Sequence, residues 1–212
     1  MAAVSLAAFA PRKTPVQRRA AVTVGAISEA AIQILLKQGV NRLTTTRVAE
    51  RAGVSVGTLY QYYPNKQSLL LAVLADHLDH VTAAVEAACE QARHQPLSEM
   101  VRAVVEAFVD AKMERSDVSR ALYQFATDVG GPALVKRVGQ RSRKALEAML
   151  QTAPDIASPP DTFAVEMMFA AMAGATRYVL EAGASATMMR GLRQQLVVLC
   201  QAYMRAQPGS RR

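Results

Sequence analysis

The sequence predicts an all-α chain in which a small three-helix head is joined by a long fourth helix to a larger C-terminal helical body, with about nine helices in total. Three observations support this. Apolar residues recur at helical spacing along most of the 212 residues. They make up 51% of the chain while aromatic residues make up 5%, which favours helices packed through Ala, Leu, Val and Met. Finally, Pro and Gly stand at the ends of the periodic stretches, where helices stop.

Residues 1–17 are expected to form a disordered basic arm. The opening MAAVSLAAFA is a weak match to a signal peptide, because Arg12 and Lys13 follow the apolar stretch instead of preceding it. No run of eighteen apolar residues is present, so no membrane span is expected and the protein is placed in the cytoplasm. Basic, Pro-containing arms can reach along a DNA backbone or into a minor groove, although a solvated tail is the preferred interpretation.

The first helix is predicted over residues 18–38, and Gly39 is expected to end it. One face of this helix is apolar at helical spacing, through Ile27, Ala31, Ile34 and Leu35. The next two helices are expected to pack against this face.

The stretch from Thr44 to Lys66 has the spacing of a helix-turn-helix. Ala49 supplies a small contact residue, Gly53 a turn residue free to take positive φ, and Leu59 an apolar anchor. Thr44 and Ser55 are expected to cap the second and third helices, and Pro64 to stop the third. The apolar positions expected to hold this pair against the first helix are Val48, Ala52, Val54 and Tyr62. On spacing alone, an αα-hairpin of a helical bundle is an equal alternative.

Charge favours the DNA-binding alternative. Residues 1–66 hold nine Lys and Arg against two acids, and the remainder holds sixteen against fifteen. A basic N-terminal third, followed by a remainder with nearly equal numbers of basic and acidic residues, is typical of a chain whose N-terminal domain binds a polyanion.

Residues 53–70, GVSVGTLYQYYPNKQSLL, resemble the signature of the TetR family of transcriptional regulators nearly position by position. The resemblance covers about fifty residues, from the first helix to the start of the fourth. It implies that DNA contacts come from the start of the second helix, the exposed face of the third and the start of the fourth. Carried over to this chain, these positions are Thr45, Thr46, Arg47, Ser55, Val56, Gly57, Thr58, Tyr60, Gln61 and Lys66.

The chemistry of these side chains suits nucleic acid. Arg47 can donate to guanine or phosphate, and Gln61 can pair with adenine. The hydroxyls of Tyr60 and Tyr63 suit phosphates, so Tyr63 joins the predicted site, whereas Tyr62 is expected to pack against the first helix.

The fourth helix is predicted from a cap at Asn65 to about His94. Within it His77 and His80 lie three residues apart beside carboxylates, but two solvated pairs are the preferred interpretation over a metal site. No metal or cofactor is therefore expected. The two cysteines, Cys89 and Cys200, are predicted to be buried thiols.

Five further helices are predicted over residues 97–115, 117–129, 133–152, 161–181 and 187–206. The helix over 133–152 is rich in Lys and Arg. A solvated face is the preferred interpretation of these charges, with a second nucleic-acid surface as the alternative. The family resemblance implies that the last two helices form a four-helix bundle with a second subunit, although they can also complete the core. The expected interface residues are Ala170, Gly174, Leu192, Leu196, Leu199 and Tyr203.

The family resemblance also implies a pocket for a small-molecule effector among the middle helices. Met and aromatic side chains can line an apolar pocket, but core filling is the preferred interpretation for any one of them. The candidates are Phe108, Tyr123, Met168 and Met172.

The function expected from the sequence is a homodimeric, ligand-responsive repressor that binds a palindromic operator and is released by its effector. The expected domains are the arm (1–17), a DNA-binding head (18–66) and an effector-binding and dimerisation body (67–212). An architectural DNA-binding protein without an effector is one alternative. A helical-bundle enzyme is another, but no nucleophile with a base, acid pair or metal cluster stands at recognisable spacing.

Overall fold

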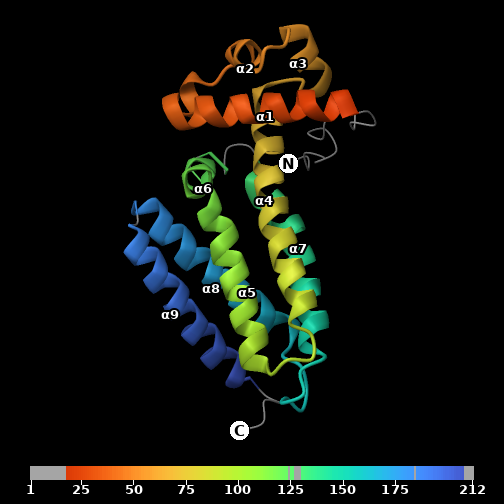
Figure 1. Ribbon diagram of the computed structural model, residues 1–212, viewed down its shortest axis with the longest axis vertical. Coiled ribbons are helices and arrows are strands. Elements are labelled where there is room, and N and C mark those ends of the chain that lie inside the picture. Colours follow the sequence, from red (N-terminus) through yellow and green to blue (C-terminus); the bar gives the residue numbers. More distant parts are fainter. Residues whose placement is uncertain (1–17, 124, 127–129, 184, 208–212) are drawn as a thin grey trace, which may run out of the picture. The chain divides into compact units, whose positions relative to one another are not determined.

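The fold is all-α, as the sequence predicts (Figure 1). The computed structural model describes residues 18–123, 125–126, 130–183 and 185–207. These residues form nine α-helices and one short 3-10 helix, η2. The predicted N-terminal arm lies outside the described residues.

The N-terminal helices form the expected three-helix arrangement. They are α1 (Arg18–Gln38), η2 (Val40–Arg42), α2 (Thr45–Ala52) and α3 (Val56–Tyr62). α1 packs against α2, and α2 packs against α3. The predicted apolar face of α1 is buried, as are Val48, Ala49 and Leu59 of the two following helices.

Local sequence signals set the ends of these helices. The hydroxyl of Thr44 accepts a hydrogen bond from the backbone N–H of Arg47, and that of Ser55 accepts one from Thr58. Gly53 lies in the left-handed region at φ 68°, which turns the chain steeply between α2 and α3. The predicted caps and turn of the helix-turn-helix are thus confirmed.

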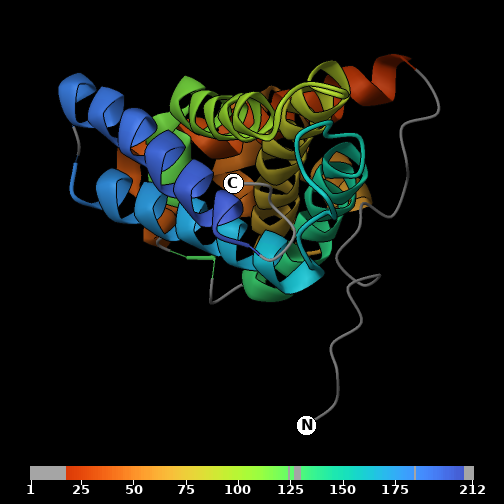
Figure 2. The same ribbon diagram turned by 90° about the horizontal axis from the view of Figure 1, so that it is seen from below.

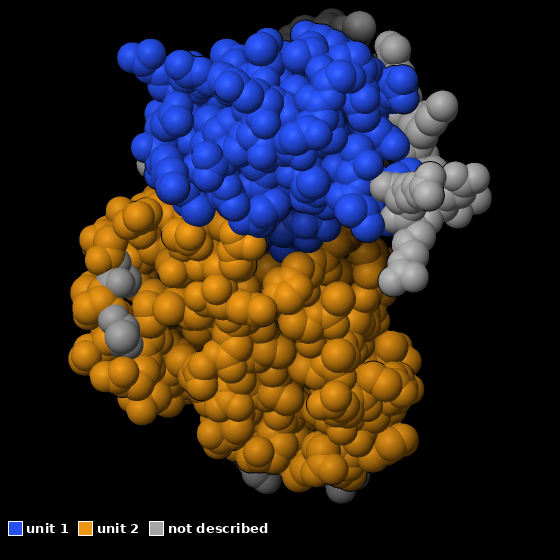
Figure 3. Space-filling model, turned by 45° about the horizontal axis from the view of Figure 1, so that its top comes forward, with its two compact units in different colours: residues 1–77, 121–135 blue, residues 78–120, 136–212 orange. Residues whose placement is uncertain are grey.

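Helix α4 (Lys66–Gln91) begins beside the side chain of Asn65, which caps it by accepting from the N–H of Ser68 at 2.8 Å. The chain divides into two compact units (Figure 3), and one of the boundaries, between residues 77 and 78, lies within this helix. The first unit contains residues 1–77 and 121–135, and the second contains 78–120 and 136–212. The remaining helices are α5 (Leu97–Glu114), α6 (Ser116–Tyr123), α7 (Gly131–Leu150), α8 (Thr162–Glu181) and α9 (Ala186–Arg205).

Helix α6 is shorter than predicted, because it ends at Tyr123 and not near residue 129. Gly130, at φ 82°, precedes α7, and the N–H of Gly131 donates to the carbonyl oxygen of Ala126 at 2.7 Å. A Cβ atom on Gly131 would lie only 2.3 Å from that oxygen. Glycine at 131 therefore permits this close approach to Ala126, and α7 starts earlier than expected.

The second unit is organised around one apolar cluster that includes the predicted inner face of α5. Helices α8 and α9 lie side by side, as Figure 2 shows, and α9 also packs against α5. The side-chain amide of Gln201 donates to the carbonyl of Ser98 at 2.8 Å, and Arg193 pairs with Asp110 near the other end of α5. These two contacts show that α5 and α9 run antiparallel.

Three helices, over residues 20–38, 66–91 and 162–181, are long and apolar enough to cross a membrane by length and composition. Part of each helix is buried inside the fold. The absence of a membrane span stays a prediction.

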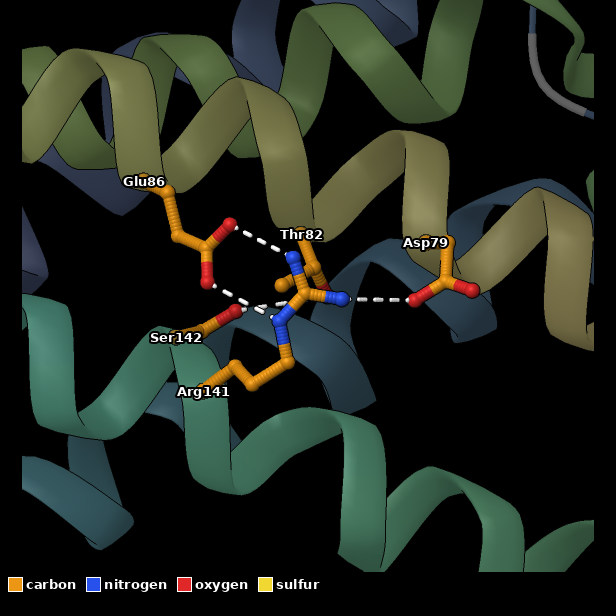
Figure 4. A network of polar contacts seen from close by, with 5 residues as sticks. All are labelled: Asp79, Thr82, Glu86, Arg141 and Ser142. Atoms are coloured by element: carbon orange, nitrogen blue, oxygen red, sulfur yellow. Dashed lines mark hydrogen bonds and ion pairs between the residues drawn. The ribbon is translucent and has the colours of Figure 1, made fainter.

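Arg141 of α7 joins α7 to the part of α4 that belongs to the second unit (Figure 4). Its guanidinium donates to both carboxylate oxygens of Glu86, at 3.0 and 2.7 Å, and to Asp79 at 2.8 Å. The hydrogen bonds to Glu86, followed by its charge and that of Asp79, raise the pKa of Arg141. Arg141, one of the basic residues expected on a solvated face of this helix, therefore makes a contact between α7 and α4.

Replacing Arg141 with Met is expected to lower the free energy of unfolding by about 1 kcal/mol, because the pair is bidentate but exposed to solvent. Urea denaturation of Arg141→Met, Glu86→Gln and the double variant would give a coupling of about 0.5 kcal/mol or more, and less at high salt. Arg137→Met, on the same helix, is the matched control and should change stability by less than about 0.5 kcal/mol. Additive single effects would contradict the prediction.

Candidate nucleic-acid interface

The outer face of α3 is small and polar. Val56, Gly57, Tyr60 and Gln61 are exposed, and Thr58 is half-buried. Among the described residues, and apart from its own helical backbone, a Cβ on Gly57 would meet only the hydroxyl oxygen of Ser55, at 3.7 Å. A backbone without bulky side chains at the first turn of α3 can approach base edges closely.

Tyr60 is held by a contact between α2 and α3. Its hydroxyl lies 3.2 Å from the hydroxyl of Thr45, at the first position of α2. This hydrogen bond brings together two residues that the sequence predicts to contact DNA. It orients the phenol ring across the start of α2.

Arg47 is positioned by the end of α1. Its Nη1 atom donates to the side-chain oxygen of Gln38 at 3.1 Å and to the carbonyl of Arg42 at 3.3 Å. On the next turn of α2, Nε of Arg51 donates to Gln33 at 2.6 Å. Sequence reasoning missed both glutamines, because they fall on the polar side of α1 and only the fold brings them to α2.

Lys66 has a structural contact of its own. Its ammonium donates to the carbonyl of Val40 at 2.6 Å, so it joins the first turn of α4 to η2. Lys66 is half-buried. It stays a predicted DNA contact, but its replacement would also disturb the connection after α1.

The prediction for Tyr63 is corrected by the structure. Tyr63 is only 2% exposed, so its hydroxyl does not lie at the surface where a phosphate could accept from it. Burial, with a smaller contribution from Asp76, raises the pKa of Tyr63 to about 12. Tyr62, assigned to packing, is the half-buried member of the pair.

The predicted dimer face is only partly accessible in one chain. Ala170, Gly174 and Leu199 are exposed, and Leu192 and Tyr203 are half-buried. Leu196 is 2% exposed and belongs to the core cluster, so the structure corrects its assignment to an interface. Sequence reasoning missed other large apolar side chains that α8 and α9 expose, namely Phe163, Met167, Tyr178, Met188 and Val198.

The predicted effector residues fall into two places. Phe108, Met168 and Met172 are buried in one apolar cluster of the second unit. Tyr123 is half-buried and belongs to the first unit, so the structure does not group it with the other three.

The histidine pair does not converge on one site. His77 is buried, whereas Nε2 of His80 lies 2.8 Å from a carboxylate oxygen of Glu114 on α5. Among the described residues, no group of three or more His, Cys, Asp or Glu side chains is placed to hold a metal ion. The buried thiols predicted for Cys89 and Cys200 are confirmed.

Two family models match this chain. The model of bacterial regulatory proteins of the tetR family matches residues 27–73, and that of the tetracyclin repressor-like C-terminal domain matches residues 96–204. The second match covers about half of the sequence and lies entirely outside the helix-turn-helix.

Curated relatives agree with these matches. The HTH-type transcriptional activator FasR of Mycolicibacterium smegmatis is 32% identical over 100 residues, 47% of this chain and 45% of FasR. The HTH-type transcriptional repressor KstR of the same organism is 39% identical over 62 residues, 29% of this chain and 30% of KstR. In both cases the match spans less than half of the relative.

Solved structures share the fold over most of its length. A protein described as a TetR-family transcriptional regulator from Mesorhizobium loti superposes with a TM-score of 0.72 at 15% identity, covering 88% of this chain and 97% of that one. The fatty acid degradation regulator FadR from Bacillus halodurans gives 0.63 at 17% identity, covering 82% and 97%. Since the two family models account for both the helix-turn-helix and the C-terminal helices, this chain is a member of the TetR family of transcriptional regulators, with a DNA-binding helix-turn-helix.

Proposed function

We propose that this regulator is a homodimeric, ligand-responsive repressor that acts in the cytoplasm on a palindromic operator. The observation that carries the proposal is the outer face of α3, which is small, polar and flanked by Tyr60 and Arg47 in fixed orientations. Two such faces, related by a twofold axis, fit two half-sites of one operator. Residues 18–66 are the proposed DNA-binding domain, and residues 67–212 the proposed effector-binding and dimerisation domain.

Each side chain at this face has a proposed role. Gln61 and Thr58 read base edges, with Val56 near a thymine methyl group. Thr46, Tyr60 and Lys66 contact phosphates, and the backbone at Ser55 and Gly57 comes close to the groove. Arg47 contacts a guanine or a phosphate after exchanging its bond to Gln38.

Dimerisation is assigned to α8 and α9. Their exposed apolar side chains include Phe163, Tyr178 and Leu199, and an apolar face on two adjacent helices can pair with its own copy as a four-helix bundle. An effector bound within 67–212 would favour one of two arrangements of the heads and so lower operator affinity. Activation is the alternative that FasR represents, since that relative is named an activator.

Replacing Gln61 with Ala is expected to weaken operator binding by about tenfold or more, because one bidentate base contact contributes about 1–3 kcal/mol. Gln61 is exposed and lies within α3, where Ala preserves the helix. Gel-shift titration of the DNA upstream of its own gene, at about 50 and about 200 mM salt, would measure the effect.

The matched control is Gln140→Ala, an exposed glutamine of α7, which should bind like the wild type. If the wild type binds this DNA no better than unrelated DNA, regulation of its own gene is rejected. If Gln61→Ala binds as tightly as the wild type, the outer face of α3 does not read bases at this position.

The proposed response to a small-molecule effector is tested separately. A compound that raises the melting temperature and also speeds release of DNA would support ligand response. If a broad screen returns none, an effector-independent DNA-binding protein is the better description.

A further inference from the structure

Gly57 lies at the centre of the outer face of α3. Of the seven residues of this helix, all of them described, Leu59 alone is fully buried, with 0% of its surface exposed. At about 100° per residue, Gly57 lies about 200° around the helix from Leu59, on the side that faces solvent. The exposed side chains of Val56, Tyr60 and Gln61 lie around it. The middle of the face proposed to enter the groove therefore has no side chain.

The fold gives no reason for a glycine at this position. Gly57 is not among the glycines with a positive φ. Among the described residues, and apart from its chain neighbours and its own helical backbone, a Cβ would meet only the hydroxyl oxygen of Ser55, at 3.7 Å, which is an ordinary van der Waals contact. Inside a helix alanine is the most favourable residue, and glycine is less favourable than any other except proline. An alanine would fit and would stabilise α3, so the space at Gly57 points to a molecule outside the chain.

The residues on either side of Gly57 are β-branched and carry methyl groups. Val56 is 36% exposed. The hydroxyl of Thr58 lies 2.8 Å from that of Ser55, whose oxygen also accepts from the backbone N–H of Thr58 at 3.0 Å. The cap of α3 thus uses the hydroxyl of Thr58, and the methyl group is the apolar part of this half-buried side chain. Gly57 therefore has an apolar neighbour on one side and a methyl-bearing one on the other.

The major groove of DNA presents one group that suits such a site. Its base edges carry hydrogen-bond donors and acceptors, and the only apolar group among them is the C5-methyl group of thymine. A position without a side chain, between a valine and a threonine, offers apolar contact and no side-chain hydrogen bond. A thymine methyl group at this position would take the volume that the Cβ of an alanine would fill.

We propose that Gly57 is a specificity-determining residue, whose missing side chain admits the C5-methyl group of one thymine in each half-site of the operator. Val56 and Thr58 contact this methyl group from the two sides of Gly57. The inference rests on the proposed function only in placing the outer face of α3 in the major groove of a twofold operator.

The first test removes the methyl group from the DNA alone. Each thymine of the half-site is replaced in turn by deoxyuridine, in both half-sites together, and gel shifts at one fixed salt concentration measure binding by the full-length wild type. At one thymine the replacement is expected to weaken binding by about tenfold, because each operator loses two buried methyl groups. If no thymine gives more than about a twofold effect, the inference is overturned.

The second test supplies the methyl group from the protein. Gly57→Ala places a Cβ where the thymine methyl group is proposed to lie, so it is expected to weaken binding to the thymine operator by about tenfold or more. This variant should bind the deoxyuridine operator at least as tightly as the thymine operator, so that the preference of the wild type is lost or reversed. Equal weakening on both operators would overturn the inference, because the added Cβ would then meet a different part of the DNA.

Gly25→Ala is the matched control for this substitution. Gly25 is an exposed glycine within α1, and a Cβ there would meet no other described residue within 4 Å beyond its chain neighbours and its own helix. It should bind both operators like the wild type. Both variants should melt at or above the wild-type temperature, because alanine favours the helix. A lower melting temperature for Gly57→Ala would show that this glycine serves the fold, and would overturn the inference.

The source of the operator separates this inference from the proposed function. The operator is taken from the DNA upstream of the gene or, if that DNA is not bound specifically, from duplexes that the protein selects out of a random pool. Specific binding without a deoxyuridine effect rejects only the role of Gly57. If neither source yields a specifically bound duplex, the proposed function is rejected together with this inference.

Discussion

Replacing Leu199 with Glu is expected to convert a dimer into monomers and to lower operator affinity by at least about tenfold. Leu199 lies on α9 with 52% of its surface exposed in one chain. Neighbouring exposed side chains on α8 and α9 are large and apolar, Tyr178 and Val198 among them. In a twofold interface each substitution occurs twice, so two carboxylates would lose solvent on association.

Size-exclusion chromatography with light scattering would give the mass of each variant, and gel shifts the affinity. Val135→Glu is the matched control. Val135, like Leu199, is an exposed apolar residue with a branched side chain, but it lies on α7. It should leave the mass unchanged. A wild-type monomer at micromolar concentration would reject the dimer, and a dimeric Leu199→Glu variant would place the interface elsewhere.

The error at Tyr63 shows where sequence periodicity stops working. Tyr63 is predicted to contact DNA because its hydroxyl suits a phosphate, but α3 ends at Tyr62 and Tyr63 has an extended backbone, at φ −128° and ψ 108°. Pro64 disfavours the helical region for the residue before it, so the side chain of Tyr63 leaves the helical phase and turns into the core. The stop was predictable from Pro64, but the direction of the side chain after the stop was not.

The error at Leu196 has a different origin. Helix α9 carries apolar residues on more than one face, and Leu196 faces the core of its own chain while Leu199 faces outward. Periodicity identifies apolar faces but gives no means to assign one of them to the core and another to a partner. The caps at Thr44, Ser55 and Asn65 could be predicted because each acts within three residues of its partner.

Contacts between distant residues had no sequence signal at all. Arg141 meets Glu86 and Asp79 across 55 and 62 positions, and in the sequence it stands among other basic residues of the same helix. Lys112 was also missed, because a lysine near the end of a helix is normally expected to extend into solvent. Only the packed helices show that it lies on the buried row of α5.

Replacing Lys112 with Met is expected to raise the free energy of unfolding at pH 7, by up to about 3 kcal/mol. The pKa of this lysine falls from 10.5 to about 8 in the folded protein, so folding buries a cation that the unfolded chain keeps in water. Below pH 8 both states are protonated and the cost is fully present. Between pH 8 and 10.5 the unfolded chain binds more protons, so the wild type gains stability from Lys112 as pH rises.

The advantage of the Met variant should therefore be largest near pH 7 and should disappear as pH approaches 10.5. Burial raises the pKa values of Cys89, Cys200 and Tyr63, and these groups act in the opposite direction, because the unfolded chain releases their protons first. These groups are common to both proteins, so urea denaturation of the wild type and of Lys112→Met at matched pH isolates the contribution of Lys112 to the free energy of unfolding.

Lys112→Arg is the control: a guanidinium stays charged, so this variant should gain no stability from position 112 over the same pH range. A difference between wild type and Lys112→Met that does not change with pH would mean that Lys112 keeps its proton in the folded protein. A large difference that vanishes at high pH would show that the chain retains a buried cation at a cost to its own stability.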